Sequence, residues 1–147
     1  MSVRPTLNHR LSLLTGFFLI LLGLATPAST KERHLKKFFS EIVVLPNGSV
    51  DVTENITFQF VGGPWHGINR YIPVEYSGPR GLNYTLFLDV KGVTDDTGAK
   101  LRFETSRERH YLNLKIYIAN ADNTTRTISI HYVVSDALKF FDDHDEF

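Results

Sequence analysis

Apolar and polar residues alternate along residues 50–60, and this stretch carries the clearest structural signal in the chain. Its apolar parity consists of Val50, Val52, Ile56, Phe58 and Phe60. The other parity is made of Asp, Thr, Asn and Gln residues, and a period of two is typical of a β-strand with one buried and one solvated face. Glu54 is the one charged residue in the apolar series. The stretch is therefore predicted to be a strand at the centre of the fold.

A tight turn is predicted directly before this strand. Pro46, Asn47 and Gly48 supply a fixed φ, a side chain suited to turns and a residue that accepts positive φ. Residues 37–45 are apolar enough to form the preceding strand. The sequence therefore predicts a β-hairpin from residue 37 to residue 60.

The same alternation recurs further along the chain, between short turn sequences. We expect strands at residues 82–93, 100–106, 111–118 and 124–134, and a short edge strand at residues 70–74. The expected inward residues include Leu86, Leu88, Leu101, Phe103, Leu112, Leu114, Ile116, Ile128, Ile130, Tyr132 and Val134. The pattern predicts an all-β fold, an antiparallel β-sandwich of about seven strands that is immunoglobulin-like in general architecture.

The N-terminus has the pattern of an export signal. Residues 1–10 carry Arg4 and Arg10 without an acidic residue, and residues 11–24 form an apolar run that is short for a membrane span. Small residues follow, so we expect a hydrophobic signal helix that is removed after residue 28. An uncleaved N-terminal anchor is the alternative, and both place the rest of the chain outside the cytoplasm.

Charge and cysteine content narrow the environment and the partners. The chain balances 16 basic against 16 acidic residues, so neither nucleic acid nor an anionic lipid surface is the expected main partner. It contains no cysteine, which excludes disulfides and thiolate metal sites. An exported chain without cysteine fits a bacterial or archaeal cell envelope.

The predicted organisation is a signal at residues 1–28, a polar spacer at residues 29–37 and one β domain at residues 38–147. The spacer is basic and has little to bury. Residues 135–147 lose the alternation and end on an aromatic residue, which suggests a domain that is incomplete at its C-terminal end.

The loop at residues 61–73 is the best candidate for a recognition site. It combines three glycines and two prolines with the only tryptophan, and Trp65, His66 and Arg70 are its candidate binding residues. A tryptophan ring can stack on a sugar, and a guanidinium can hold a carboxylate or phosphate. The alternative is structural: Trp65 caps the fold and Arg70 ties loop carbonyls together.

The acidic C-terminal stretch is a weaker candidate for a metal site. Asp142, Asp143 and Asp145 lie close in sequence and offer oxygen ligands, but their spacing matches no calcium loop. We find no spacing typical of a zinc site, a nucleophile elbow or a Ser-His-Asp set. We therefore expect no cofactor and no catalytic activity, and a surface hydrogen bond for His131.

The mature region resembles the N-terminal domain of the DUF2207 family of predicted bacterial and archaeal membrane proteins. The similarity comprises the hairpin of residues 42–60, in which Pro-Asn-Gly leads into Val-x-Val-x-Glu, and the motif Gly67-Ile68-x-Arg70-x-Ile72-Pro73. It continues through the strand at residues 127–134 and the acidic-aromatic stretch at residues 140–147. The resemblance covers nearly all of residues 35–147, and the order and spacing of its motifs are its most specific feature.

This resemblance implies an extracytoplasmic β domain attached to the membrane by later spans or by an uncleaved N-terminal segment. The family's activity is undefined. We therefore expect an extracytoplasmic sensor or interaction domain at the cell envelope, with a protein or glycan partner. A carbohydrate-binding or adhesion module is the first alternative, and an envelope hydrolase is the weaker one.

Overall fold

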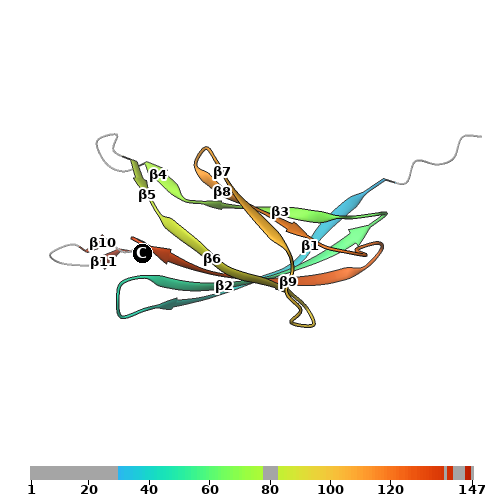
Figure 1. Cartoon of the computed structure of the whole chain (residues 1–147), viewed down its shortest axis with the longest axis horizontal. Helices are drawn as coiled ribbons and strands as arrows, with labels where there is room; N and C mark the ends of the chain where they lie inside the picture. Colours follow the sequence, from blue (N-terminus) through green and yellow to red (C-terminus); the bar gives the residue numbers. More distant parts are fainter. Residues whose placement is uncertain (1–29, 78–82, 138, 141–144, 147) are drawn as a thin grey trace, which may run out of the picture.

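The computed structural model describes residues 30–77, 83–137, 139–140 and 145–146, and their regular structure is entirely antiparallel β (Figure 1). The all-β prediction is confirmed for these residues, which contain no helix. Accordingly, they offer no helix long and apolar enough to cross a membrane. The expected signal helix at residues 1–28 lies outside the described residues.

The strands follow one another along the chain with short connections. Their bounds are β1 (Glu32–Val44), β2 (Val50–Val61), β3 (Gly67–Pro73), β4 (Glu75–Ser77), β5 (Asn83–Thr85), β6 (Phe87–Asp95), β7 (Phe103–Glu108), β8 (Tyr111–Tyr117), β9 (Thr125–Ser135), β10 (Lys139–Phe140) and β11 (Asp145–Glu146).

Two larger sheets form the body of the domain. The four-stranded sheet has the order β1-β2-β9-β6, and the three-stranded sheet has the order β3-β8-β7. In Figure 1 the three-stranded sheet lies above the four-stranded sheet, with the short β4-β5 pair at one end. The four-stranded sheet thus has one strand more than the sheet that faces it.

One hydrophobic core lies between these two sheets, because alternate residues of each strand point toward the other sheet. The four-stranded sheet contributes Val50, Val52, Ile56, Phe60, Val93, Ile128 and Ile130. The three-stranded sheet contributes Ile68, Ile72, Leu114 and Ile116. The alternation seen in the sequence of β2, β8 and β9 therefore identified their buried faces correctly.

The predicted first hairpin is confirmed. β1 pairs antiparallel with β2, with Val44 opposite Val50 at the turn. Gly48 has a φ of 79°, and its N–H donates to the carbonyl of Leu45 at 2.9 Å. A residue without a side chain is favoured at this positive φ, as the Pro-Asn-Gly sequence predicted.

The predicted polar spacer is wrong for most of its length, because β1 already begins at Glu32. Its first residues are polar and exposed, so they carry no apolar signal. Backbone pairing with β2 forms the strand without burial of these side chains, and this pairing starts with Glu32 opposite Val61.

Two further predictions need correction. β3 begins at Gly67 and not at Arg70, so half of the expected loop at residues 61–73 is strand. The strand expected at residues 82–93 is interrupted at Leu86, whose N–H donates to the carbonyl of Val74. A register shift between Val90 and Gly92 then reverses the parity of β6, so Val93 is the fully buried residue.

Gly67 is required where β3 meets β8, and its replacement tests this close approach. A Cβ at Gly67 would lie 2.3 Å from the carbonyl oxygen of Ile116, so Gly67→Ala should lower the free energy of unfolding by about 2 kcal/mol. Chemical denaturation measures the change. Gly92→Ala is the control, because a Cβ there meets no atom within 4 Å. Equal stability of the two variants would contradict the close approach.

Candidate functional site

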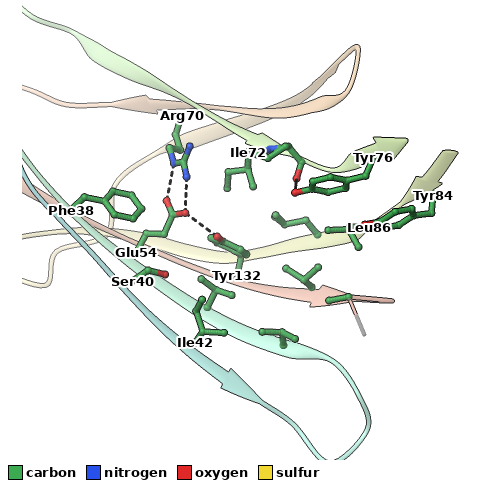
Figure 2. A pocket seen from close by; sticks show the side chains of 16 residues that line it. Phe38, Ser40, Ile42, Glu54, Arg70, Ile72, Tyr76, Tyr84, Leu86 and Tyr132 are labelled. Carbon is green, nitrogen blue, oxygen red and sulfur yellow. Dashed lines mark hydrogen bonds and ion pairs between the residues drawn. The ribbon is translucent and has the colours of Figure 1, made fainter. Parts of the chain in front are cut away.

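A cavity of about 450 Å³ opens between the four-stranded sheet and strands β3 to β5 (Figure 2). Its wall is mainly aliphatic and includes Ile42, Val52, Ile72, Leu86, Leu88 and Val134. Phe38, Tyr76, Tyr84 and Tyr132 add aromatic rings. The size and the apolar wall with a few polar groups are typical of a site for a small ligand.

Glu54 is the acidic group of this cavity and is almost completely buried, with 3% of its surface exposed. Its Oε1 accepts hydrogen bonds from Arg70 Nη2 at 2.8 Å and from the Tyr132 hydroxyl at 2.9 Å. Its Oε2 accepts from Arg70 Nε at 2.8 Å. Both carboxylate oxygens are therefore bound by protein donors, which compensates the cost of burying the charge.

Arg70 crosses from the three-stranded sheet to meet this carboxylate, as Figure 2 shows. Its planar guanidinium binds Glu54 through two nitrogens, and Nη1 donates to the carbonyl of Tyr71 at 2.6 Å. The Phe38 ring lies 5.8 Å from the guanidinium carbon. The hydrogen bonds with Glu54 raise the pKa of Arg70, so the group stays charged.

Tyr132 completes a network that joins three strands, since Glu54 lies on β2, Arg70 on β3 and Tyr132 on β9. Burial raises the pKa of the Tyr132 phenol, and the neighbouring Glu54 carboxylate raises it further. The hydroxyl thus remains a neutral donor to Glu54. The network forms the charged part of a cavity wall that is otherwise mainly apolar.

The sequence places these side chains through strand parity. Glu54 shares its parity with Val52 and Ile56, and Arg70 shares its parity with Ile68 and Ile72. Each charged residue therefore points into the core from its own sheet. The sequence did contain a signal for this pair, because Glu54 and Arg70 carry opposite charges and each interrupts an apolar series. The sequence analysis noted only the interruption at Glu54.

Trp65 and His66 precede β3 and line a different hollow from Arg70. The two residues line a shallow hollow with Tyr71 and Tyr117, whereas Arg70 lines the apolar cavity. The structure therefore brings Trp65 and His66 together and separates Arg70 from them.

The Trp65 side chain is partly used for packing. Its ring centroid lies 5.4 Å from that of Phe60, and its Nε1 donates to the carbonyl of Val61 at 3.2 Å. Its backbone N–H donates to Asp122 at 3.1 Å. These contacts match the structural alternative for Trp65, a cap at one end of the core.

Metal binding finds no support in the described part of the chain. There, no group of three or more His, Asp or Glu side chains is placed to hold an ion. Asp142 and Asp143 lie outside the described residues, as does the side chain of Asp145. The predicted surface hydrogen bond of His131 is confirmed: its Nε2 lies 3.0 Å from Asp51 on the solvated face of β9.

Comparison with known proteins identifies a family for most of the chain. A family model described as "Predicted membrane protein (DUF2207) N-terminal domain" matches residues 34–147. No curated protein matches the chain. Among solved structures it is similar to native leukotriene A4 hydrolase from Saccharomyces cerevisiae, with a TM-score of 0.49 and 16% identity. That match covers 76% of this chain and only 17% of the hydrolase chain.

Removal of Arg70 should destabilise the domain by leaving a buried carboxylate without its ion pair. We expect Arg70→Met to lower the free energy of unfolding by about 3 kcal/mol. Adding Glu54→Gln should recover a large part of this loss, because the uncompensated charge is gone. Lys91→Met is the control and should cost less than about 0.5 kcal/mol, since the pair of Lys91 with Asp89 is exposed. Chemical denaturation of the native chain, the two single variants and the double variant measures these differences. Equal losses in Arg70→Met and Lys91→Met would contradict the role of the buried pair.

The raised pKa of Tyr132 predicts a loss of stability at alkaline pH. A phenol with a higher pKa in the folded state stabilises folding below its unfolded pKa of about 10, and this contribution declines as the pH rises above that value. The stability advantage of the native chain over Tyr132→Phe should thus shrink by about 1 kcal/mol between about pH 8 and about pH 11. A constant difference across this range would contradict the assignment.

Proposed function

The chain belongs to the DUF2207 family of predicted membrane proteins, and we propose that it is an extracytoplasmic sensor domain that binds a mainly apolar ligand. The observation that carries the proposal is the cavity of about 450 Å³ with its mainly apolar wall. The basic N-terminal residues and the apolar run at residues 11–24 favour export. We also infer that the two larger sheets are the layers of an immunoglobulin-like sandwich, since both supply the core.

The chemistry of the cavity favours binding over catalysis. The Glu54 carboxylate accepts three hydrogen bonds from Arg70 and Tyr132, so both of its oxygens are already bound by protein donors and neither is free to face a substrate. Aliphatic and aromatic side chains form most of the remaining surface. A ligand with an acyl or aromatic part would bury it there, and a polar end would lie near Arg70.

Glycan binding is the second candidate function. The hollow beside β3 is lined by Trp65, His66, Tyr71 and Tyr117, with the cationic side chains of Arg33 and Lys115 nearby. Aromatic rings at a surface are suited to stacking on sugar rings. This candidate depends on Trp65 and its hollow, whereas the first depends on the separate cavity that Arg70 lines.

A neutral fluorescent probe, N-phenylnaphthylamine, tests the cavity in the full chain. Ala137 lines the cavity, so Ala137→Phe should fill part of it and weaken probe binding by about fivefold or more. Ser135→Phe is the matched control, because Ser135 is exposed at the end of β9 and does not line the cavity. Its probe affinity should equal that of the native chain.

Thermal melting of both variants shows whether each one folds. Equal probe affinity in the native chain and in a folded Ala137→Phe variant would overturn the cavity as the binding site. Unchanged probe affinity in both folded variants would place the probe elsewhere, for example in the hollow beside β3, because neither variant alters that hollow.

A further inference from the structure

The free edge of β1 is the longest unpaired strand edge among the described residues. β1 spans Glu32–Val44 and pairs along one side with β2, and no other described strand pairs with it. Its other side therefore presents a row of backbone N–H and C=O groups that can accept another strand.

Exposed apolar side chains concentrate on this strand. Among the described residues, eleven large hydrophobic side chains are exposed, and six of them belong to β1: Leu35, Phe38, Phe39, Ile42, Val43 and Val44. Their exposed fractions range from 48% to 59%. Isolated exposed apolar residues are normal on a protein surface, but a run of this kind along one edge marks an interaction site.

Edge strands usually carry features that prevent pairing, such as charges, prolines or bulges. β1 has such features only in its first half, where the register shifts between Leu35 and Lys37 and basic residues gather. From Phe38 to Val44 the pairing with β2 is regular, and Glu41 is the only charged residue. The second half of the edge is thus open to another strand.

We propose that this edge joins two copies of the chain through antiparallel pairing of β1 with β1, with Phe39 on the two-fold axis. An axis perpendicular to the sheet keeps the inner faces of both copies on one side. In this register Lys37 lies opposite the partner's Glu41, and Glu41 lies opposite the partner's Lys37. Phe39 faces the partner's Phe39.

Charge complementarity favours β1 of a second copy as the partner strand, and it favours this register. Lys37 and Glu41 point to the same face of the strand, and neither has an ion-pair partner within the described part of the chain. The pairing supplies a partner for both charges in both copies. A register with Ser40 on the axis would instead place Glu41 against the partner's Phe39, which gives no such compensation.

The dimer also extends the cavity wall. Phe38 and Ser40 point to the inner face and line the open side of the cavity. Across the axis, the partner's Phe38 lies opposite Ser40 on the same inner face, so its ring borders the cavity from outside. The dimer does not depend on the proposed ligand, because the pairing involves the backbone edge and the charges of β1 alone.

Charge reversal tests the interface by sedimentation of the full chain and three variants. The native chain should dimerise, and Lys37→Glu or Glu41→Lys should each weaken the dimer about tenfold or more, because like charges then face each other. The double variant with both reversals should restore the native affinity. Both side chains are exposed, so folding is unaffected by either change. A monomeric native chain, or a dimer that neither single reversal weakens, would overturn the proposal.

Cysteine cross-linking tests the register, because the chain has no cysteine of its own. Phe39→Cys places two thiols across the axis, where a short bismaleimide should link the copies. Val43→Cys is the control. Val43 lies on the same exposed face as Phe39, but in this register it is far from Val43 of the other chain. Linking at neither position, or equally at both, would contradict pairing centred on Phe39. Native probe affinity in Lys37→Glu, measured at a concentration where this variant is monomeric, would show that ligand binding and dimerisation are separate.

Discussion

The ion pair between Glu54 and Arg70 is the constraint on which the rest of the structure depends. It joins the two sheets through a core that is otherwise apolar, and Tyr132 adds a third strand. A shift of β2 or β3 by one residue would turn its charged side chain to the solvent and expose the apolar residues beside it. The pair therefore specifies how the two sheets face each other, beyond whatever stability it contributes.

The same pair determines the character of the cavity. Both oxygens of Glu54 are bound by protein donors, so the carboxylate does not require water or a metal to compensate its charge. The space beside it is lined by side chains such as Ile72 and Leu86. A cavity with a satisfied polar wall and an apolar remainder selects ligands by shape and by apolar surface.

Much of the fold could be predicted from local sequence patterns, because a strand with one buried face carries its signal within itself. The alternation in β2, β8 and β9 predicted their inward residues correctly. The predicted start of β1 was too late, because neither face of its first residues is buried. The predicted inward face of β6 was wrong beyond Val90, because a bulge there reverses the alternation. Such features depend on the neighbouring strand, which a single segment of sequence does not contain.

The candidate site was harder to predict because proximity in sequence suggested the wrong grouping. Trp65, His66 and Arg70 lie within six positions, yet parity directs Arg70 inward while Trp65 and His66 border a separate hollow. The partner of Arg70 is Glu54, sixteen positions earlier. Glu54 and Arg70 both lie on the inward parity of their strands, and this shared parity, not closeness in the sequence, indicates that they meet.

One feature of the topology accounts for both the open cavity and the exposed edge. The sheet β1-β2-β9-β6 has four strands, and the facing sheet β3-β8-β7 has three. β1 forms one edge of the larger sheet, and its inner residues Phe38 and Ile42 remain half exposed. A fourth strand beside β3 would cover them and close the cavity. Because that fourth strand is absent from the facing sheet, the cavity stays open beside the free edge of β1. A second chain that paired with this edge would therefore lie next to the opening of the cavity.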